Sequence, residues 1–358
     1  MTETTRARIA VIGAGLIGRE HVALLRRHPG AELAAIADVT PEGEALAREC
    51  GVACHADYRR MLREVPLDGA IIALPNQLHL EAGLACIEHG VAMLMEKPVA
   101  DTLASALALA QAVEAGGVPL LVGHQRRHSP DIVAAHRAIT QGELGPLVTV
   151  NGMWWMHKNE RYFDAEWRRR PGGGPLLINL IHDIDCLRFL CGEVETVQAS
   201  VSSHARGFAV EDTAAVILRF ANGALGTFSL SDAVPSPYTW DGSSGQALYF
   251  PSQRENCYFI GGRRASLAVP TLARWQHEGE GRWQDPLVCH QVQREVASAY
   301  ERQLTHFLAV AARRAPPVVS ARDGMRTLAT IHAIQQAAAS GAPVRVDEVI
   351  AEASGEVA

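Results

Sequence analysis

A lysine and a histidine carry the chemistry that this sequence offers most clearly. Lys97 lies in Met95-Glu96-Lys97-Pro98, directly after an apolar run, and His182 lies in His182-Asp183-Ile184-Asp185, within a helical pattern. Imidazole titrates near neutral pH and can pass on the proton of a hydroxyl group. A lysine next to a positive charge loses its own proton more easily, and it can then deprotonate an alcohol oxygen or hydrogen-bond to it. The pair predicts proton transfer to or from an alcohol.

A glycine-rich turn near the start of the chain indicates a nucleotide site. Gly13-Ala14-Gly15-Leu16-Ile17-Gly18 lies between an expected strand, Arg8 to Ile12, and an expected helix from Gly15 to about His28. Gly13 permits the tight turn, Gly15 lets the backbone approach a pyrophosphate, and Gly18 allows close packing of the helix on the strand. The helix N-terminus, with Leu16 and Ile17, offers free N–H groups to the phosphates. The alternative is a turn that binds nothing.

Asp38 ends the next expected strand, Glu32 to Ala37, where a carboxylate can accept hydrogen bonds from the ribose hydroxyls of a dinucleotide. Val39 and Thr40 follow it, and we expect no arginine nearby to bind a 2′-phosphate. We therefore expect NAD as the cofactor, with NADP less favoured.

The pattern of elements predicts an α/β protein of two domains. In residues 1–123, short apolar runs alternate with helical patterns, which is typical of a Rossmann parallel sheet. Residues 124–358 have longer expected strands, and Asn222-Gly223 indicates a hairpin between two of them. We expect an α+β domain there, with a large antiparallel sheet that has one face covered by the helices Pro175 to Leu190 and Arg294 to Arg313. Ser236 to Gly245 is expected to be an irregular, mobile loop at the substrate site.

Composition excludes several classes of protein. A net charge of −6 over 358 residues is unlike a nucleic-acid-binding protein. The apolar stretches are too short to span a membrane and no signal peptide is recognised, so we expect a cytoplasmic location. Seven cysteines without C-x-x-C spacing indicate reduced thiols, and His124 and His128 lack an acidic partner between them, so no metal site is expected.

Motifs spread over nearly the whole chain resemble the glucose-fructose oxidoreductase, inositol dehydrogenase and MocA family. These are the glycine turn, Ala73-Leu74-Pro75-Asn76-Gln77-Leu78-His79, Glu96-Lys97-Pro98, Gly123-His124-Gln125-Arg126-Arg127, Trp167-Arg168, the Gly172-Gly173-Gly174 turn and His182-Asp183-Ile184-Asp185. The resemblance implies that the antiparallel sheet is open-faced and that NAD lies between the two domains. It also implies oxidation of a secondary hydroxyl or reduction of a ketone, with Lys97 at the nicotinamide and Pro98 commonly cis.

The same resemblance, together with positions at the sheet edge, assigns further residues. For the cofactor they are Pro75, Asn76, His79, Glu96, Lys97 and Gln125. For the substrate they are Asn179, Asp185, Arg127, Arg168 and His157, beside the catalytic Lys97 and His182. Asp185 could alternatively orient the His182 ring, His79 could be a helix-start residue without a contact, and the arginines could be solvated.

One position departs from the family pattern. Many relatives carry an aspartate four residues before the histidine, where this chain has Ile178 followed by Asn179. Asn179 can hydrogen-bond but cannot act as a base, so the proton relay of the family is in question here.

The leading hypothesis is an NAD-dependent oxidoreductase that transfers a hydride between nicotinamide and a secondary alcohol or ketone of a sugar, polyol or cyclic diol. An NAD-dependent glycosidase of the same family and a non-catalytic NAD-binding sensor are the alternatives. The expected partner is a small molecule, and we expect a homodimer or homotetramer formed through the open sheet face, because pairing removes an exposed apolar patch.

Overall fold

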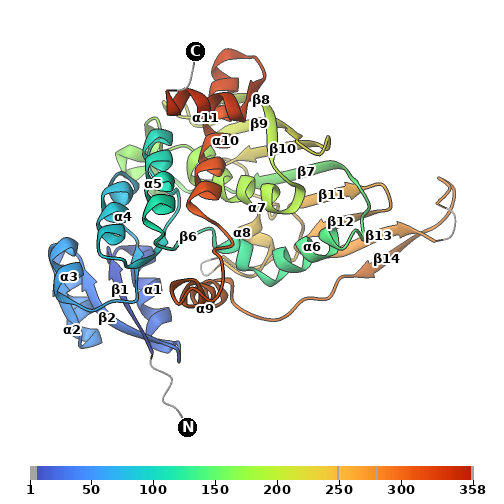
Figure 1. The fold of residues 1–358 in the computed structure, drawn as a ribbon. Coiled ribbons are helices and arrows are strands. Elements are labelled where there is room, and N and C mark those ends of the chain that lie inside the picture. Colours follow the sequence, from blue (N-terminus) through green and yellow to red (C-terminus); the bar gives the residue numbers. More distant parts are fainter. Residues whose placement is uncertain (1–5, 248–249, 279–280, 356–358) are drawn as a thin grey trace, which may run out of the picture.

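The computed structural model describes residues 6–247, 250–278 and 281–355, which form two sheets joined into one molecule (Figure 1). The blue and cyan elements of the N-terminal part surround the first sheet, and the green to orange strands form the second. None of the helices in these ranges combines the length and the apolar character needed to cross a membrane.

The first sheet is a Rossmann sheet, as predicted. Its six parallel strands have the order β3-β2-β1-β4-β5-β6, and β4, β5 and the last four residues of β1 are buried because helices cover both faces. The strands are β1 (Ala7–Ile12), β2 (Ala31–Ala37), β3 (Ala53–His55), β4 (Gly69–Ile72), β5 (Ala92–Met95) and β6 (Leu120–Val122). The helices between them are α1 (Leu16–Arg27), α2 (Pro41–Cys50), α3 (Tyr58–Glu64), α4 (His79–Glu88) and α5 (Leu103–Gly116).

The second sheet has nine strands in the order β14-β13-β12-β11-β7-β10-β9-β8-β15. Within the described part of this second sheet, β7 and β10 are the one parallel pair, so the sheet is mainly antiparallel, as predicted. The hairpin at Asn222-Gly223 is confirmed, with Gly223 at a φ of 88°. The strands are β7 (Leu147–Trp155), β8 (Val194–Ser202), β9 (Thr213–Phe220), β10 (Leu225–Ser231), β11 (Tyr258–Gly262), β12 (Ala265–Val269), β13 (Ala273–His277), β14 (Leu287–Gln291) and β15 (Val344–Arg345).

One face of this second sheet is open. Side chains along β9 alternate between buried and exposed, which is the pattern of a strand with one covered face. The helices α6 (Pro130–Thr140), α7 (Ile181–Cys191) and α10 (Ala321–Ser340) lie on the covered side, and α11 (Val346–Ser354) follows β15 (Figure 1). Large apolar side chains are exposed along the strands, among them Ile217, Leu225, Phe259, Trp275 and Leu287.

The helix expected from Arg294 to Arg313 was assigned to the wrong sheet. It is α9 (Ala299–Ala311), and it packs against α1, β5 and β6 of the first domain. Phe307 is fully buried there, and its Cζ lies 2.8 Å from where a Cβ at Gly69 would be. An amphipathic pattern predicts that a helix has an apolar face, but not which surface that face contacts.

Two other segments differ in detail from the prediction. The expected helix Pro175 to Leu190 begins with a π-helical turn, Leu176–Leu180, before α7. The segment Ser236 to Gly245 is not wholly irregular, because Trp240–Ser243 forms a short helix, α8, with Thr239 and Trp240 buried.

Candidate active site

A cavity of about 820 Å³ lies where the two domains meet. The first domain contributes Leu16 and Ile17 of the glycine turn, Leu74, Glu96 and Lys97. The turn after β6 adds Gln125 and Arg126, and the second domain contributes a polar set that includes Trp154, His157, Lys158, Asn179, His182 and Asp241. The cavity therefore brings together eight of the predicted site residues: Leu16, Ile17, Glu96, Lys97, Gln125, His157, Asn179 and His182.

The glycine turn leaves space for a ligand only at its middle glycine. A Cβ at Gly13, where φ is 94°, would lie 2.6 Å from the Ala73 carbonyl oxygen, and one at Gly18 would lie 2.0 Å from the Gly13 carbonyl oxygen. A Cβ at Gly15 would meet nothing within 4 Å. Gly15 is also the N-cap of α1, and no side chain caps that helix end. The backbone here is thus accessible to a phosphate group.

Asp38 is tied to the same turn. Its Oδ2 accepts a hydrogen bond of 2.6 Å from the backbone N–H of Ala14, and its Oδ1 accepts from the N–H and hydroxyl of Thr40. Burial opposes ionisation, but these hydrogen bonds and the charge of Arg19 lower the pKa of Asp38. Arg19 corrects the expectation that no arginine lies nearby, because α1 brings it close from the N-terminal side of the sequence.

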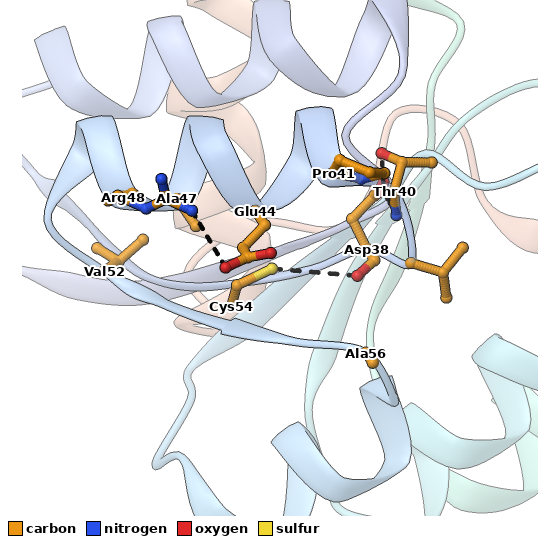
Figure 2. A pocket seen from close by; sticks show the side chains of 10 residues that line it. Asp38, Thr40, Pro41, Glu44, Ala47, Arg48, Val52, Cys54 and Ala56 are labelled. Carbon is orange, nitrogen blue, oxygen red and sulfur yellow. Dashed lines mark hydrogen bonds and ion pairs between the residues drawn. The ribbon is translucent and has the colours of Figure 1, made fainter.

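A second cavity, of about 500 Å³, lies beside Asp38 between α2 and β3 (Figure 2). Glu44 and Arg48 face it and pair with each other at 3.1 Å, and the Cys54 thiol lies 4.0 Å from the Asp38 carbonyl oxygen. Arg48 is already paired with the Glu44 carboxylate. The charged group that this cavity offers to a nucleotide is therefore the Asp38 carboxylate.

Glu96 and Lys97 follow β5, and the Lys97–Pro98 peptide bond is cis, as expected. Glu96 is buried and accepts a 2.8 Å hydrogen bond from Nε2 of His21 on α1. Burial would raise the pKa of Glu96, but His21 and Lys97 hold it below its ordinary value. Burial lowers the pKa of Lys97; Arg126 lowers it further, while Glu96 and Asp241 oppose that shift.

His182, near the start of α7, lines the cavity with Lys97. Burial and the positive charges of Lys97 and Arg126 lower the pKa of His182 well below its ordinary value. Its Nδ1 is buried and has no hydrogen-bond partner among the described residues. The His124 ring lies edge-on, 6.2 Å away between ring centroids. His182 is therefore a neutral imidazole at the cavity wall.

Arg126 and Arg127 are adjacent in the chain, but their side chains lie in different places. Arg126 lines the cavity and contacts Asp183 at 2.9 Å and Asp241 at 3.2 Å. Arg127 lies behind it and makes two hydrogen bonds to Asp185, of 2.7 and 2.9 Å. Asp185 does not contact His182; it lies 3.9 Å from Nδ1 of His124 instead.

Several predicted residues have contacts other than those expected. The ring nitrogens of His79 lie 2.9 Å from the Pro98 carbonyl oxygen and 3.0 Å from that of Leu74, so this histidine holds two loops of the cavity wall in place. Pro75 and Asn76 lie at the sheet edge next to Leu74. Arg127 and Asp185 bind each other, and Arg168 contacts the Tyr162 carbonyl oxygen and stacks on that ring at 4.0 Å.

Sequence reasoning missed Arg126, Trp154, Lys158 and Asp241. Nothing in the Gln125-Arg126-Arg127 run shows which arginine faces the cavity, and Asp241 lies in the polar segment that was expected to be a mobile loop. Asp241 accepts a 3.2 Å hydrogen bond from Nε1 of Trp154. Asn179, at the position in question, accepts a 2.7 Å hydrogen bond from Nζ of Lys158.

A Rossmann sheet whose glycine turn borders one cavity with a lysine and a histidine is the arrangement expected of a nicotinamide-dependent oxidoreductase. Residues 7–124 match the model of the oxidoreductase family's NAD-binding Rossmann fold, and residues 136–346 match that of its C-terminal alpha/beta domain. The chain belongs to this family, the glucose-fructose oxidoreductase, inositol dehydrogenase and MocA family. It is an NAD(P)-dependent enzyme acting on CH–OH groups, with NAD as its cofactor.

Several relatives match nearly the whole chain. D-apiose dehydrogenase of Paraburkholderia graminis is 28% identical, covering 98% of this chain and 93% of its own length. The scyllo-inositol 2-dehydrogenase (NAD(+)) of Bacillus subtilis is also 28% identical, covering 96% and 97%. An oxidoreductase from Agrobacterium radiobacter, solved with NAD+, L-tartaric acid and magnesium, superimposes with a TM-score of 0.80 at 20% identity, covering 96% and 99%.

Asp38→Ala should weaken the binding of NAD more than that of NADP and so narrow the ratio between their affinities. The carboxylate is placed to accept ribose hydroxyls and would repel a 2′-phosphate. Titration calorimetry measures both affinities, and Glu44→Ala removes a matched carboxylate from the neighbouring cavity. If the wild-type protein binds NADP more tightly than NAD, the role given to Asp38 is wrong.

Asp185→Ala should lower the stability to urea by about 3 to 5 kcal/mol, because it leaves Arg127 buried without its partner. The ordinary pKa of an aspartate is 3.8, and that of Asp185 is lowered: burial opposes the shift, but His124 and Arg127 outweigh it. The stabilisation is thus present above that pH and is lost as the pH falls toward the folded pKa. The control is Asp347→Ala, whose carboxylate pairs with Arg326 at the surface and should cost less than about 1 kcal/mol. Unchanged stability with lost turnover would instead place Asp185 at the substrate.

Proposed function

We propose that this enzyme transfers a hydride between NAD and a secondary alcohol or ketone of a sugar, polyol or cyclic diol. The observation that carries the proposal is the shared cavity: Lys97 comes from the first domain and His182 from the second, and Leu16 and Ile17 of the glycine turn lie in the same wall. The activities named for the relatives, on apiose and on inositol, support this class of substrate.

The residues present fit the cofactor. The open face of Gly15, the uncapped start of α1 and the Asp38 carboxylate suit the pyrophosphate and a ribose. When bound, the nicotinamide supplies the hydride acceptor for oxidation or the hydride donor for reduction. Leu16 and Ile17 would hold it from the turn, and Glu96 and Lys97 border the cavity at the end of β5.

The proton of the substrate hydroxyl is handled by this chain's own side chains. Lys97 can hydrogen-bond the alcohol oxygen, and its lowered pKa increases the fraction of the neutral amine, the form that can accept a proton. His182, kept neutral by burial and by neighbouring cations, can accept the proton. Because each group changes the charge felt by the other, they titrate as a pair, and oxidation should become faster as the pH rises through their apparent pKa.

Replacing either group should reduce turnover without unfolding the protein. Lys97→Ala should lose about 10²-fold or more in kcat, and His182→Asn about 10²- to 10⁴-fold with loss or displacement of the pH inflection. NADH absorbance with a panel of sugars, polyols and cyclic diols measures the rates, and exposed His204→Asn is the control. Unchanged kcat in both variants would contradict the mechanism. Release of nitrophenol from nitrophenyl glycosides, without net NADH, would favour the glycosidase instead.

We also infer a homodimer or homotetramer formed through the open face of the second sheet. The exposed apolar residues along β9 to β14, such as Ile217, Phe259 and Trp275, support this assembly. Light scattering should give the mass of two or four chains, and Phe259→Glu should reduce it. A wild-type mass of one chain would contradict the inference. The cytoplasmic location stays a prediction.

A further inference from the structure

Lysine is almost absent from this chain. Among its 33 lysines and arginines, the lysines are Lys97 and Lys158, and both line the cavity at the domain junction. Arginine thus provides the positive charge everywhere else. A lysine differs from arginine in being compact and in losing its proton readily when buried. Lys97 has a role in the proposed mechanism, which leaves the function of Lys158 to be explained.

The ammonium group of Lys158 is held rigidly on the second domain's side of the cavity. Its Nζ donates to Oδ1 of Asn179 at 2.7 Å and lies 3.7 Å from Oδ2 of Asp232. It also lies over two aromatic rings, 4.6 Å from the centroid of Tyr162 and 5.5 Å from that of Trp154. An ammonium group has three donors. These partners leave one donor for a molecule in the cavity.

The charge of Lys158 is only partly balanced. Asp232 also accepts a 2.7 Å hydrogen bond from Nε of Arg206, so one carboxylate serves two cations. Burial, with the charges of Arg206 and Arg168, lowers the pKa of Lys158 to about 8, against the opposing effect of Asp232. Burial raises the pKa of the nearby Glu211, which also interacts electrostatically with Asp232 and Lys158. The Glu211 carboxylate accepts a hydrogen bond from the backbone N–H of Leu176.

The rest of the cavity wall adds to this positive surplus. Arg161 and His157 are exposed and line the cavity next to Lys158. Among the described residues of this wall, the carboxylates are Glu96 and Asp241, and these already pair with His21 and Arg126. An anionic group that enters beside Lys158 would therefore meet unpaired donors on the cavity wall, where both carboxylates are already paired.

We propose that Lys158 binds a carboxylate of the substrate, so that the substrate is a hydroxy acid or a sugar acid rather than a neutral polyol. The proposal rests on the proposed function: the reacting hydroxyl lies at Lys97 and His182 while the carboxylate is held by Lys158. Lys158 would then determine specificity by binding a part of the substrate that does not react.

Because the chain has only two lysines, a lysine-specific reagent can report directly on whether a ligand covers Lys158. Trace labelling with acetic anhydride, followed by mass spectrometry of the Lys97 and Lys158 peptides, is run on NADH-loaded protein. D-glucuronate, D-galacturonate and D-gluconate are compared with D-glucose, D-galactose and D-glucitol. At least one acid should slow the acetylation of Lys158 several-fold, and its neutral counterpart should not. Protection by the neutral compounds alone would overturn the proposal.

Substitutions separate charge from size. Lys158→Met should raise the Kd or KM for the acid at least tenfold while changing kcat less, and Lys158→Arg should retain part of the affinity. Arg169→Met, an exposed position outside the cavity wall, is the matched control. Equal KM values for the acid in the wild type and Lys158→Met would contradict a role in binding the carboxylate.

The pH dependence tests the identity of the cation. Protonated Lys158 attracts the carboxylate, so kcat/KM for the acid should fall as the pH rises through about 8 in the wild type. This fall should be absent in Lys158→Arg, because a guanidinium keeps its proton. A fall of the same size in both proteins would assign the titration to another group and count against Lys158.

The outcomes also separate the two proposals. If neutral polyols reduce NAD and the acids neither react nor protect Lys158, the dehydrogenase stands and the acid site is wrong. If the acids protect Lys158 but no compound of either kind yields NADH, the acid site stands and the proposed function is wrong.

Discussion

Two neighbouring buried ion pairs connect the turn after the first sheet to a helix that packs on the second. The turn after β6 carries Arg126 and Arg127, and these bind Asp183 and Asp185 of α7 with contacts of 2.7 to 2.9 Å. The turn continues the first sheet, whereas α7 lies on the second, so the pairs link the segment that follows β6 to the helix that carries His182. Buried ion pairs add little net stability compared with apolar packing, but they are strict about geometry. The proposed catalytic pair, with one residue from each domain, needs that geometric precision.

The same arrangement sets the electrostatics of the cavity. Arg126 is held at the wall by Asp183 and Asp241, and its charge works against the protonation of Lys97 and His182. Removing water from this space strengthens each of these effects. A proton released by a substrate therefore reaches two side chains whose protonation Arg126 disfavours. Carboxylates around the cavity oppose this effect. Asp241 is one of them: it contacts Arg126, accepts a hydrogen bond from Trp154 and raises the pKa of Lys97.

Features that depend on a few adjacent residues could be predicted from the sequence. The glycine turn, the Glu96-Lys97-Pro98 step and the Rossmann strands are of this kind, because their function follows from backbone geometry within one βαβ unit. Features that depend on packing could not. Adjacent arginines point to different places, as Arg126 and Arg127 do, and strands of five residues with mixed polarity, such as β13 and β14, lack a clear periodicity. Asp185 shares a helix with His182, yet its partner comes from another element. Asp241 is brought to the cavity by a short helix inside a segment that composition alone made appear irregular.

Because helix α9 comes late in the sequence but packs on the first domain, that domain is completed late in synthesis. The first sheet is synthesised early, but the surface around Gly69, β5 and β6 is covered by a helix that ends at Ala311. Until Phe307 leaves the ribosome, that surface remains exposed, so the nucleotide-binding half cannot finish folding as an independent unit during translation. The first sheet and the helices between its strands come from one continuous stretch of sequence. The folded N-terminal domain also includes α9, which comes from near the other end of the chain. A fragment cut after residue 123 would expose an apolar surface where α9 belongs.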